Sequence, residues 1–290
     1  MTAWRERLGK VGIWSMELRF GDGGEIAEAA AELDELGYGA IWIPGGIGGD
    51  VPADVERLLA AAPRAIIATG ILNIWKHEAA EIAAWWKGLS PDRQARLMLG
   101  LGVSHGPLIG EAWKKPLAAT RDYVAALVGQ GVPADALCLA ALGPKMLELA
   151  RDCTTGAHPY LVTPEHTATA RAILGPDKLL APEQGVVLES DPVRARELAR
   201  EALVHYRRLP NYMNSWLRLG FTQAEIDVVD DRLIDALFAW GDCHAIAKRV
   251  QAHHDAGADH VCIQVVTGGG GLAAVRPQWR ELAAALLEAR

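Results

Sequence analysis

The sequence lacks the features that mark several large classes of protein. Basic residues are not in excess, because 29 Lys and Arg stand against 36 Asp and Glu and give a net charge of −7 at pH 7. Binding to nucleic acid needs clustered Lys and Arg for the phosphates, so we expect no nucleic-acid partner. No apolar run reaches the roughly 18 residues of a membrane span, and the first residues lack the basic and apolar segments of a signal peptide. We therefore expect a cytoplasmic protein without a membrane partner.

Motifs of common metal, nucleotide and hydrolase sites are also missing. The four cysteines are scattered without a Cys-x-x-Cys pair, and no His-Glu-x-x-His spacing occurs. We therefore expect neither a disulfide framework nor a metal site. The phosphate loop Gly-x4-Gly-Lys-Ser/Thr is absent, and no Gly-x-Gly-x-x-Gly opens a helix after the first predicted strand, which argues against the usual dinucleotide-binding fold. Ser15 and Ser104 lack the Gly-x-Ser-x-Gly setting of a hydrolase nucleophile.

Short apolar runs alternate with amphipathic helical stretches along the whole chain. This alternation predicts parallel strands joined by crossover helices. Eight strands is the count of a TIM (β/α)8 barrel, whereas an open doubly wound sheet usually needs five or six. We therefore predict an α/β fold of the TIM-barrel type. The eight runs with the length and composition of strands are 11–15, 40–43, 65–70, 97–103, 136–142, 156–162, 179–188 and 260–266.

The stretch between the seventh and eighth predicted strands is too long for one crossover helix. It carries helical patterns at 192–208, 211–219, 231–238 and 244–254. We interpret residues from roughly 190 to 240 as a helical insertion between strands 7 and 8. Because no Pro-, Gly- or Ser-rich linker divides the chain, we expect one domain over residues 1–290, closed by a helix at 278–289.

The active site of a TIM barrel lies at the carboxyl ends of its strands, so the residues after each predicted strand are the candidates for function. The second strand leads into a glycine-rich loop at 44–50, and glycine lets a backbone approach a flat ring or a phosphate closely. His105 follows the fourth strand and can move a proton near neutral pH, which makes it our candidate general acid or base. Trp14, Ser15 and Trp75 follow strand ends and are candidates for the substrate pocket.

Several segments together resemble one known family. They are 35–44 (Glu-Leu-Gly-Tyr-Gly-Ala-Ile-Trp-Ile-Pro), 68–75 (Ala-Thr-Gly-Ile-Leu-Asn-Ile-Trp), 99–105 (Leu-Gly-Leu-Gly-Val-Ser-His), 156–161 (Gly-Ala-His-Pro-Tyr-Leu) and 256–261 (Ala-Gly-Ala-Asp-His-Val). Their order and spacing over nearly the whole chain is similar to the luciferase-like monooxygenase superfamily, and most of all to its actinobacterial oxidoreductases that use coenzyme F420, a deazaflavin. The resemblance implies an oxidoreductase that transfers hydride between this cofactor and a small organic substrate. We also expect a homodimer.

The resemblance implies a cofactor site at the strand ends. A non-prolyl cis peptide at Gly70–Ile71 would lie behind the flavin ring, and backbone N–H groups after strands five and six would hold the phosphate of the cofactor tail. At Glu165 the backbone is the better candidate, since a carboxylate would repel a phosphate. The residues assigned to the cofactor are Gly45, Gly46, Gly70, Ile71, Asn73, Gly102, Ser104, Gly143, Pro144, Lys145, His158, Tyr160, Thr163 and Glu165.

One position departs from the related sugar-phosphate dehydrogenases. Those proteins carry an Asp-His pair after strand two, where this chain has Gly45 and Gly46. Their catalytic histidine and their substrate are therefore not carried over, and His105 taking that role is a hypothesis. Three alternatives stay open: an FMN-dependent monooxygenase that activates oxygen, a flavin- or deazaflavin-binding protein without turnover, and an unrelated barrel lyase or isomerase. The last would need a lysine or paired carboxylates at the strand ends, and none is clearly placed there.

Overall fold

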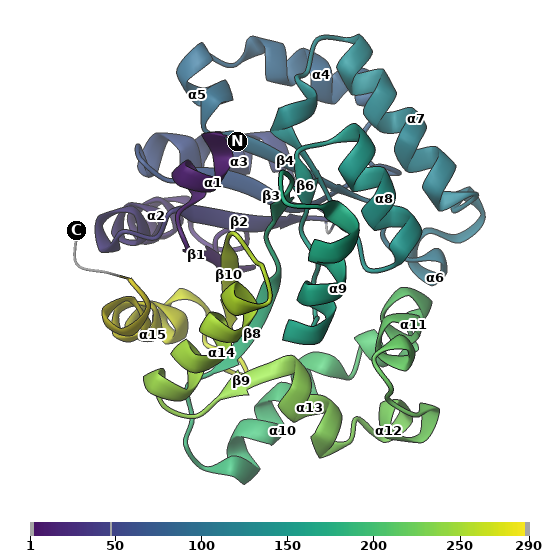
Figure 1. Cartoon of the computed structure of the whole chain (residues 1–290). Helices are drawn as coiled ribbons and strands as arrows, with labels where there is room; N and C mark the ends of the chain where they lie inside the picture. Colours follow the sequence, from purple (N-terminus) through teal and green to yellow (C-terminus); the bar gives the residue numbers. More distant parts are fainter. Residues whose placement is uncertain (1–2, 47, 288–290) are drawn as a thin grey trace.

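Short strands alternate with helices throughout the computed structural model, which describes residues 3–46 and 48–287 (Figure 1). Residue 47 of the predicted glycine-rich loop and residues 288–289 of the predicted closing helix lie outside the described residues. The described strands are β1 (Val11–Trp14), β2 (Ala40–Gly45), β3 (Ile66–Asn73), β4 (Leu97–Gly102), β5 (Leu137–Leu139), β6 (Gly156–Ala157), β7 (Leu179–Leu180), β8 (Glu183–Val187), β9 (Phe238–Trp240) and β10 (Val261–Val265).

Helices surround these strands, and local sequence signals set their ends. The Asp22 side chain caps the first long helix by accepting the backbone N–H groups of Gly24 and Glu25, and Gly37 ends that helix at φ 97°, a left-handed conformation that glycine adopts easily. Among the described residues no helix is both long and apolar enough to cross a membrane. The helices are α1 (Ala3–Leu8), α2 (Gly23–Leu36), α3 (Val51–Ala61), α4 (Ala79–Gly88), α5 (Pro91–Ala95), α6 (Gly106–Ile109), α7 (Pro116–Gly129), α8 (Pro144–Cys153), α9 (Pro164–Leu174), α10 (Pro192–Leu203), α11 (Pro210–Arg218), α12 (Gln223–Val228), α13 (Asp231–Leu237), α14 (Cys243–Asp255) and α15 (Gly271–Leu286), with 3-10 turns η1 (Gly110–Ala112), η2 (Ala134–Ala136) and η3 (Tyr206–Arg208).

The sheet closes into a barrel. All the strand pairs are parallel, and neighbours follow the order β7-β6-β5-β4-β3-β2-β1-β10-β8-β9. β7 and β8 lie far apart in this order, yet only Ala181 and Pro182 separate them in the chain, so they are two halves of one bent strand. The first half pairs with β6 and the second with β10, so the sheet returns on itself. The predicted α/β barrel is confirmed.

Two details of the sheet differ from the prediction. The predicted strand at 179–188 is interrupted at Pro182, which has no N–H to donate to a neighbouring strand. The predicted helix 231–238 ends at Leu237, and the following residues form β9, which pairs with β8. The ring of Phe238 lies 2.6 Å from the point where a Cβ of Gly185 would be, so this pairing depends on glycine in β8. A strand of three residues is too short for its periodicity to be recognised.

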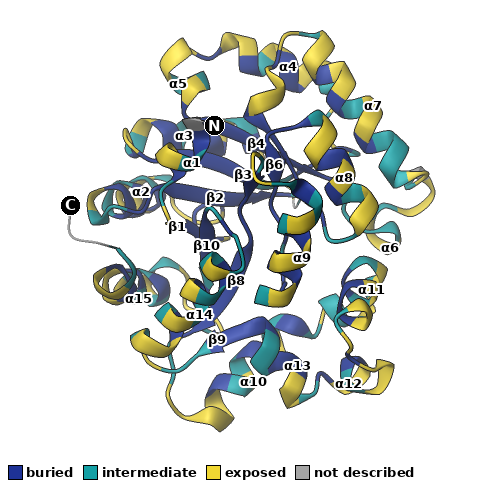
Figure 2. Ribbon diagram, in the orientation of Figure 1, coloured by how far each residue is buried: buried dark blue, intermediate teal, exposed yellow. Residues whose placement is uncertain are grey.

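The buried apolar residues form two clusters. The strands are buried, as expected of parallel strands covered by helices, while the outer faces of the helices are exposed (Figure 2). One apolar cluster, which includes Ile13, Trp42 and Leu99, belongs to the barrel. A second cluster lies among β9 and the α10–α13 segment (residues 192–237), with Trp216 and Leu233 at its centre. The α10–α13 segment therefore packs around a second core, to which Leu161 and Val187 of the barrel also contribute.

Candidate active site

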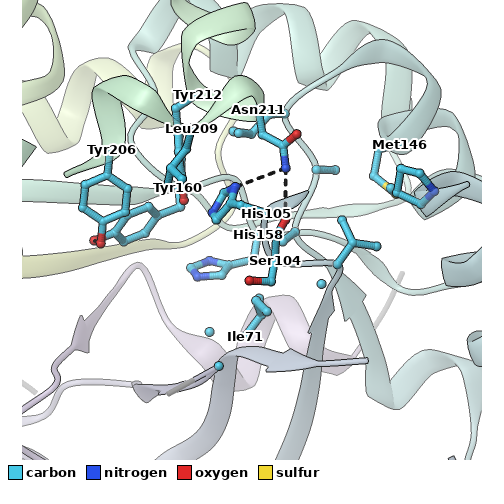
Figure 3. A pocket seen from close by; sticks show the side chains of 18 of the residues that line it. Ile71, Ser104, His105, Met146, His158, Tyr160, Tyr206, Leu209, Asn211 and Tyr212 are labelled. Atoms are coloured by element: carbon cyan, nitrogen blue, oxygen red, sulfur yellow. Dashed lines mark hydrogen bonds between the residues drawn. The ribbon is translucent and has the colours of Figure 1, made fainter. Parts of the chain in front are cut away.

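A cavity of about 440 Å³ lies at the carboxyl ends of the strands, where barrel enzymes keep their active sites (Figure 3). Its volume is in the range of small-molecule and cofactor sites. Ten residues of the predicted site line it: Trp14, Gly46, Gly70, Ile71, Gly102, Ser104, His105, Gly143, His158 and Tyr160. The structure therefore brings together residues from the ends of β1, β2, β3, β4, β5 and β6.

The floor of the cavity is the irregular part of β3. The Gly70–Ile71 peptide bond is cis, as the family resemblance implies. The register of β3 against both its neighbours shifts around this bond. Trp14 Nε1 donates to the Gly70 carbonyl oxygen at 2.9 Å. The Ile71 side chain lies 2.8 Å from the point where a Cβ of Gly102 would be, so glycine in β4 leaves room for it.

His105 is held in one tautomer by a residue from the α10–α13 segment. Asn211 Nδ2 donates to the Ser104 carbonyl oxygen at 3.1 Å and lies 3.3 Å from His105 Nδ1 (Figure 3). Because an amide nitrogen only donates, Nδ1 accepts and the proton of the neutral ring is on Nε2. Burial lowers the pKa of His105 to about 4, so the ring is neutral at pH 7. Ser104 has φ 55°, a left-handed conformation that is uncommon outside glycine and that occurs at functional sites.

His158 lies at the base of the cavity and is only 1% exposed. Its Nδ1 donates to the Ala181 carbonyl oxygen at 2.7 Å, which leaves the lone pair of the neutral ring on Nε2. This Nε2 has no hydrogen-bond partner among the described residues. The ring stacks on Trp42 with centroids 4.2 Å apart, and burial lowers the pKa of His158 to about 4.

Three tyrosines form the wall that faces Met146 across the cavity (Figure 3). Tyr160 donates its hydroxyl hydrogen to Gln264 Oε1 at 2.7 Å, and its oxygen lies 3.4 Å from that of Tyr206. The rings of Tyr206 and Tyr212 meet edge to face at 5.1 Å. Burial raises the pKa of all three hydroxyl groups, so this tyrosine wall is uncharged at neutral pH.

A buried carboxyl group lies close to the tyrosine wall. Glu183, on β8, accepts the Leu161 backbone N–H through Oε2 at 3.0 Å, and its Oε1 has no partner within the described residues. Burial raises the pKa of Glu183 to about 8, so the group is mainly protonated at pH 7. It therefore adds no full negative charge near the cavity.

The α8 end of the cavity is positive. Gly143 precedes α8, a helix of 10 residues whose N-terminus carries the positive end of the helix dipole. Arg218, at the end of α11, donates from Nη2 to the Leu142 carbonyl oxygen at 3.3 Å. The same nitrogen lies 3.7 Å from the point where a Cβ of Gly143 would be. Among the described residues that line the cavity, Arg218 carries the only charged side chain.

Eight residues of the predicted site do not line the cavity: Ser15, Gly45, Asn73, Trp75, Pro144, Lys145, Thr163 and Glu165. Ser15 donates to Glu17 at 2.6 Å, and Trp75 donates from Nε1 to a backbone carbonyl at 2.7 Å. Thr163 caps α9 by accepting a backbone N–H, and Glu165 is exposed. Their roles toward a cofactor or substrate stay predictions.

Sequence reasoning missed the contribution of the chain that leads into and includes α11. Tyr206, Leu209, Asn211, Tyr212 and Arg218 all line the cavity. They follow no barrel strand, so a search at strand ends does not reach them. One signal was available, because two of the five tyrosines in the sequence lie close together at 206 and 212.

Comparison with known proteins identifies the fold. No protein-family model matches the sequence, and no curated protein matches it either. Solved structures do match, among them an F420-dependent secondary alcohol dehydrogenase in complex with an F420-acetone adduct, with a TM-score of 0.75, 16% identity and coverage of 96% of this chain and 99% of that chain.

Two further structures show the range of these neighbours. The coenzyme F420 dependent tetrahydromethanopterin reductase from Methanopyrus kandleri has a TM-score of 0.68 at 14% identity and covers 95% of this chain and 98% of its own. The oxygenating constituent of 3,6-diketocamphane monooxygenase from the CAM plasmid of Pseudomonas putida, in complex with FMN, has a TM-score of 0.70 at 11% identity, with coverage of 96% and 97%. The chain therefore shares its barrel fold with this dehydrogenase, this reductase and this monooxygenase.

Proposed function

We propose that the protein is an oxidoreductase that binds coenzyme F420 and exchanges hydride between this deazaflavin and a small organic substrate. The observation that carries the proposal is the glycine-lined cavity at the strand ends, with Gly70 and Ile71 on its floor and the N-terminus of α8 at one end. The motifs of the sequence favour the deazaflavin, and proteins of the same fold are named as F420-dependent.

The residues of the cavity suit a flat ring that carries a phosphate tail. A Cβ added to Gly46 would meet nothing within 4 Å, so the backbone after β2 leaves open space there. Ile71 and Gly102 provide a surface for the ring, which we call the ring bed. The phosphate would lie between Gly143, at the N-terminus of α8, and the guanidinium of Arg218. A helix N-terminus and a guanidinium both favour an anion.

The chain itself has to orient the substrate and handle a proton. A bound deazaflavin supplies hydride chemistry, and the protein supplies position and electrostatics. His105 presents Nε2–H, which can donate a hydrogen bond, and then a proton, to the oxygen of a carbonyl substrate whose carbon gains hydride. The lining around this site is mainly apolar, which strengthens the hydrogen bond that His105 can donate.

An FMN-dependent monooxygenase is the second candidate, because a structure of the same fold holds FMN. Both proteins would use the same barrel and the same strand ends. The two chemistries differ in their reaction with oxygen, since a deazaflavin reacts poorly with it. Oxygen consumption with reduced cofactor therefore separates them.

The test is a fluorescence titration of the purified protein with coenzyme F420 and, separately, with FMN. Micromolar or tighter binding of F420 alone would support the proposal, and hydride transfer to or from a substrate panel would then be measured from the absorbance of the cofactor. Binding of FMN alone, with oxygen consumption, would replace the proposal by the monooxygenase. Tight F420 binding with no turnover of any substrate would favour a binding protein, and binding of neither cofactor would refute both candidates.

A further inference from the structure

Two buried histidines flank Trp42, and they differ in the surroundings of one atom. His260 donates from Nδ1 to the Gly9 carbonyl oxygen at 3.0 Å, and its Nε2 accepts from Trp42 Nε1 at 3.2 Å. His158 donates from Nδ1 to the Ala181 carbonyl oxygen in the same way and lines the cavity, but its buried Nε2 has no partner among the described residues. Leaving a buried acceptor without a donor is unfavourable. The contrast indicates that a ligand supplies the missing donor at His158.

Position 70 lies directly beside this buried acceptor. A Cβ added to Gly70 would lie 2.9 Å from His158 Nε2 and 2.7 Å from Trp14 Nε1, so any other residue there would cover the lone pair. The Trp14 ring lies 5.5 Å from the ring of Tyr160 in the tyrosine wall. The acceptor therefore belongs to the aromatic end of the cavity, which Trp14, His158 and the tyrosine wall form.

The proposed ring bed lies on the other side of Gly70. Ile71 faces Gly102 on β4, and Ala140 follows β5 beside that glycine. From there the cavity continues to Gly143 and the N-terminus of α8. A cofactor with its phosphate at α8 and its ring on the ring bed leaves the aromatic end for the substrate.

The aromatic end carries no full charge at neutral pH. The imidazoles of His105 and His158 are neutral because burial lowers the pKa of both rings. The tyrosine wall keeps its protons, and Glu183 is mainly protonated. Arg218 lies at the α8 end instead. A carboxylate or phosphate on the substrate would lose its hydration at the aromatic end without gaining a counter-charge.

We infer that His158 Nε2 accepts a hydrogen bond from the hydroxyl group of an uncharged organic substrate bound at the aromatic end. The inference rests on the proposed function only in calling this molecule the substrate. The same donor chemistry exists in the ring N–H of a deazaflavin, so the test has to separate the two donors.

A direct test uses nitrogen NMR of the full-length protein labelled with nitrogen-15 histidine, first without cofactor. The probes are two matched pairs, 2-propanol with lactate and 1-phenylethanol with mandelate, in which a carboxylate replaces one methyl group. The unprotonated Nε2 signal of His158, assigned with His158→Phe, should shift saturably with at least one alcohol and not with the anions. The Nε2 signal of His260 should not move, because Trp42 already satisfies it.

Turnover with coenzyme F420 gives a second readout. We expect His158→Phe to lower kcat/KM for the responding alcohol by about 100-fold, with the Kd for F420 changed by less than about threefold. His158→Gln should recover part of the loss, because its amide oxygen can accept the same hydrogen bond. His260→Phe is the matched control, since it removes a buried imidazole beside Trp42 that does not line the cavity. It should lower Tm and leave kcat/KM for the alcohol largely unchanged.

Each result decides the inference. A shift with an anion equal to that with its alcohol would overturn the uncharged substrate, and a His158 signal that responds to F420 alone would assign the donor to the cofactor. The absence of any response to the four probes would also overturn it. If F420 does not bind the wild-type protein while an alcohol still shifts the His158 signal, the proposed function fails and the hydroxyl site stands.

Discussion

At the scale of single residues, the fixed tautomer of His105 determines what this side chain can do. The Asn211 side chain donates a hydrogen bond to Nδ1 of His105, so the ring hydrogen is on Nε2 and is free to bind a molecule in the cavity. Since burial lowers its pKa to about 4, His105 does not change charge between pH 5.5 and 9. It acts as a neutral hydrogen-bond donor across this range and not as an imidazolium.

Replacing His105 by alanine should therefore affect turnover and spare cofactor binding. We expect kcat to fall by about 100-fold or more, with little change in the Kd for coenzyme F420. The pH–rate profile of the wild-type protein should show no step near pH 6.5 that is caused by His105. The profiles of the wild type and of His105→Ala should therefore have the same shape in this range. An unchanged rate would remove His105 from the mechanism, and Asn211→Ala should cause a smaller loss because the ring itself remains.

Glu183 should make stability depend on pH. Burial raises its pKa from 4.5 to about 8, so the folded protein keeps a proton that the unfolded chain loses above pH 4.5. Its contribution to stability is full below pH 4.5 and is lost as the pH rises through 8, with a slope of up to about 1.4 kcal/mol per pH unit. Glu183→Gln removes the ionisation, so Tm of the variant minus Tm of the wild type should increase from pH 5 to pH 8. A difference that stays constant over this range would show that Glu183 does not hold the extra proton.

The site was predictable from sequence where residues follow a strand. Trp14, Gly46, Gly70 and His105 were found because barrel chemistry is confined to strand ends. Asn211 was not found, because it lies 106 residues after His105 in the chain and meets it only through the packing of α11. For a phosphate the sequence predicts Gly143, Pro144, Lys145, Thr163 and Glu165, of which Gly143 lines the cavity. Arg218 lines it too and was not found, because a charge on one helix does not reveal which loop it will approach.

At the scale of elements, the loop after β2 should control access to the cavity. Gly46 lines the cavity, a Cβ there would meet nothing within 4 Å, and its φ lies outside the left-handed region. Gly46→Leu should therefore fold normally and lower the affinity for coenzyme F420 by about tenfold or more, because the side chain would take up space that the ring needs.

The matched control for this change is Gly129→Leu. Gly129 ends α7 away from the cavity and also has nothing within 4 Å of an added Cβ. Fluorescence titration should give wild-type affinity for Gly129→Leu, and thermal unfolding should give similar Tm values for both variants. Equal affinities in the two variants would mean that the ring does not pass over Gly46.

The order of strands and helices was predictable because burial imposes a repeating pattern on the chain. The break at Pro182 was not recognised, since the apolar run continues across it and only the missing N–H divides the strand. β9 was not recognised either, because three residues that follow a helix directly carry no periodic signal.

At the scale of the whole molecule, Asp259 joins three parts of the chain at the amino ends of the strands. Its carboxylate forms ion pairs with Arg171 of α9 at 2.6 Å and with Arg5 of α1 at 3.2 Å. It also accepts a hydrogen bond from the backbone N–H of Leu180 in β7 at 2.9 Å. Asp259→Ala should lower the free energy of unfolding by about 2 kcal/mol, or Tm by about 5 °C, and leave the affinity for coenzyme F420 unchanged.

The exposed ion pair between Arg151 and Asp152 provides the comparison for this variant. Asp152→Ala should leave Tm unchanged, because surface pairs contribute little. Thermal unfolding of both variants checks the prediction, and equal Tm values for Asp259→Ala and the wild type would contradict the role of Asp259 as a junction.

The separate core of the α10–α13 segment has a consequence for how this barrel could change over time. The segment packs around a cluster that includes Trp216 and Leu233, while most of the strands pack around another. Tyr206 and Tyr212 belong with the second cluster, whereas Tyr160 packs against both. Substitutions at Tyr206 and Tyr212 can therefore accumulate in one set of contacts while the glycine floor keeps its geometry in the other. A barrel built in this way can reshape one side of its cavity over time and keep the other side unchanged.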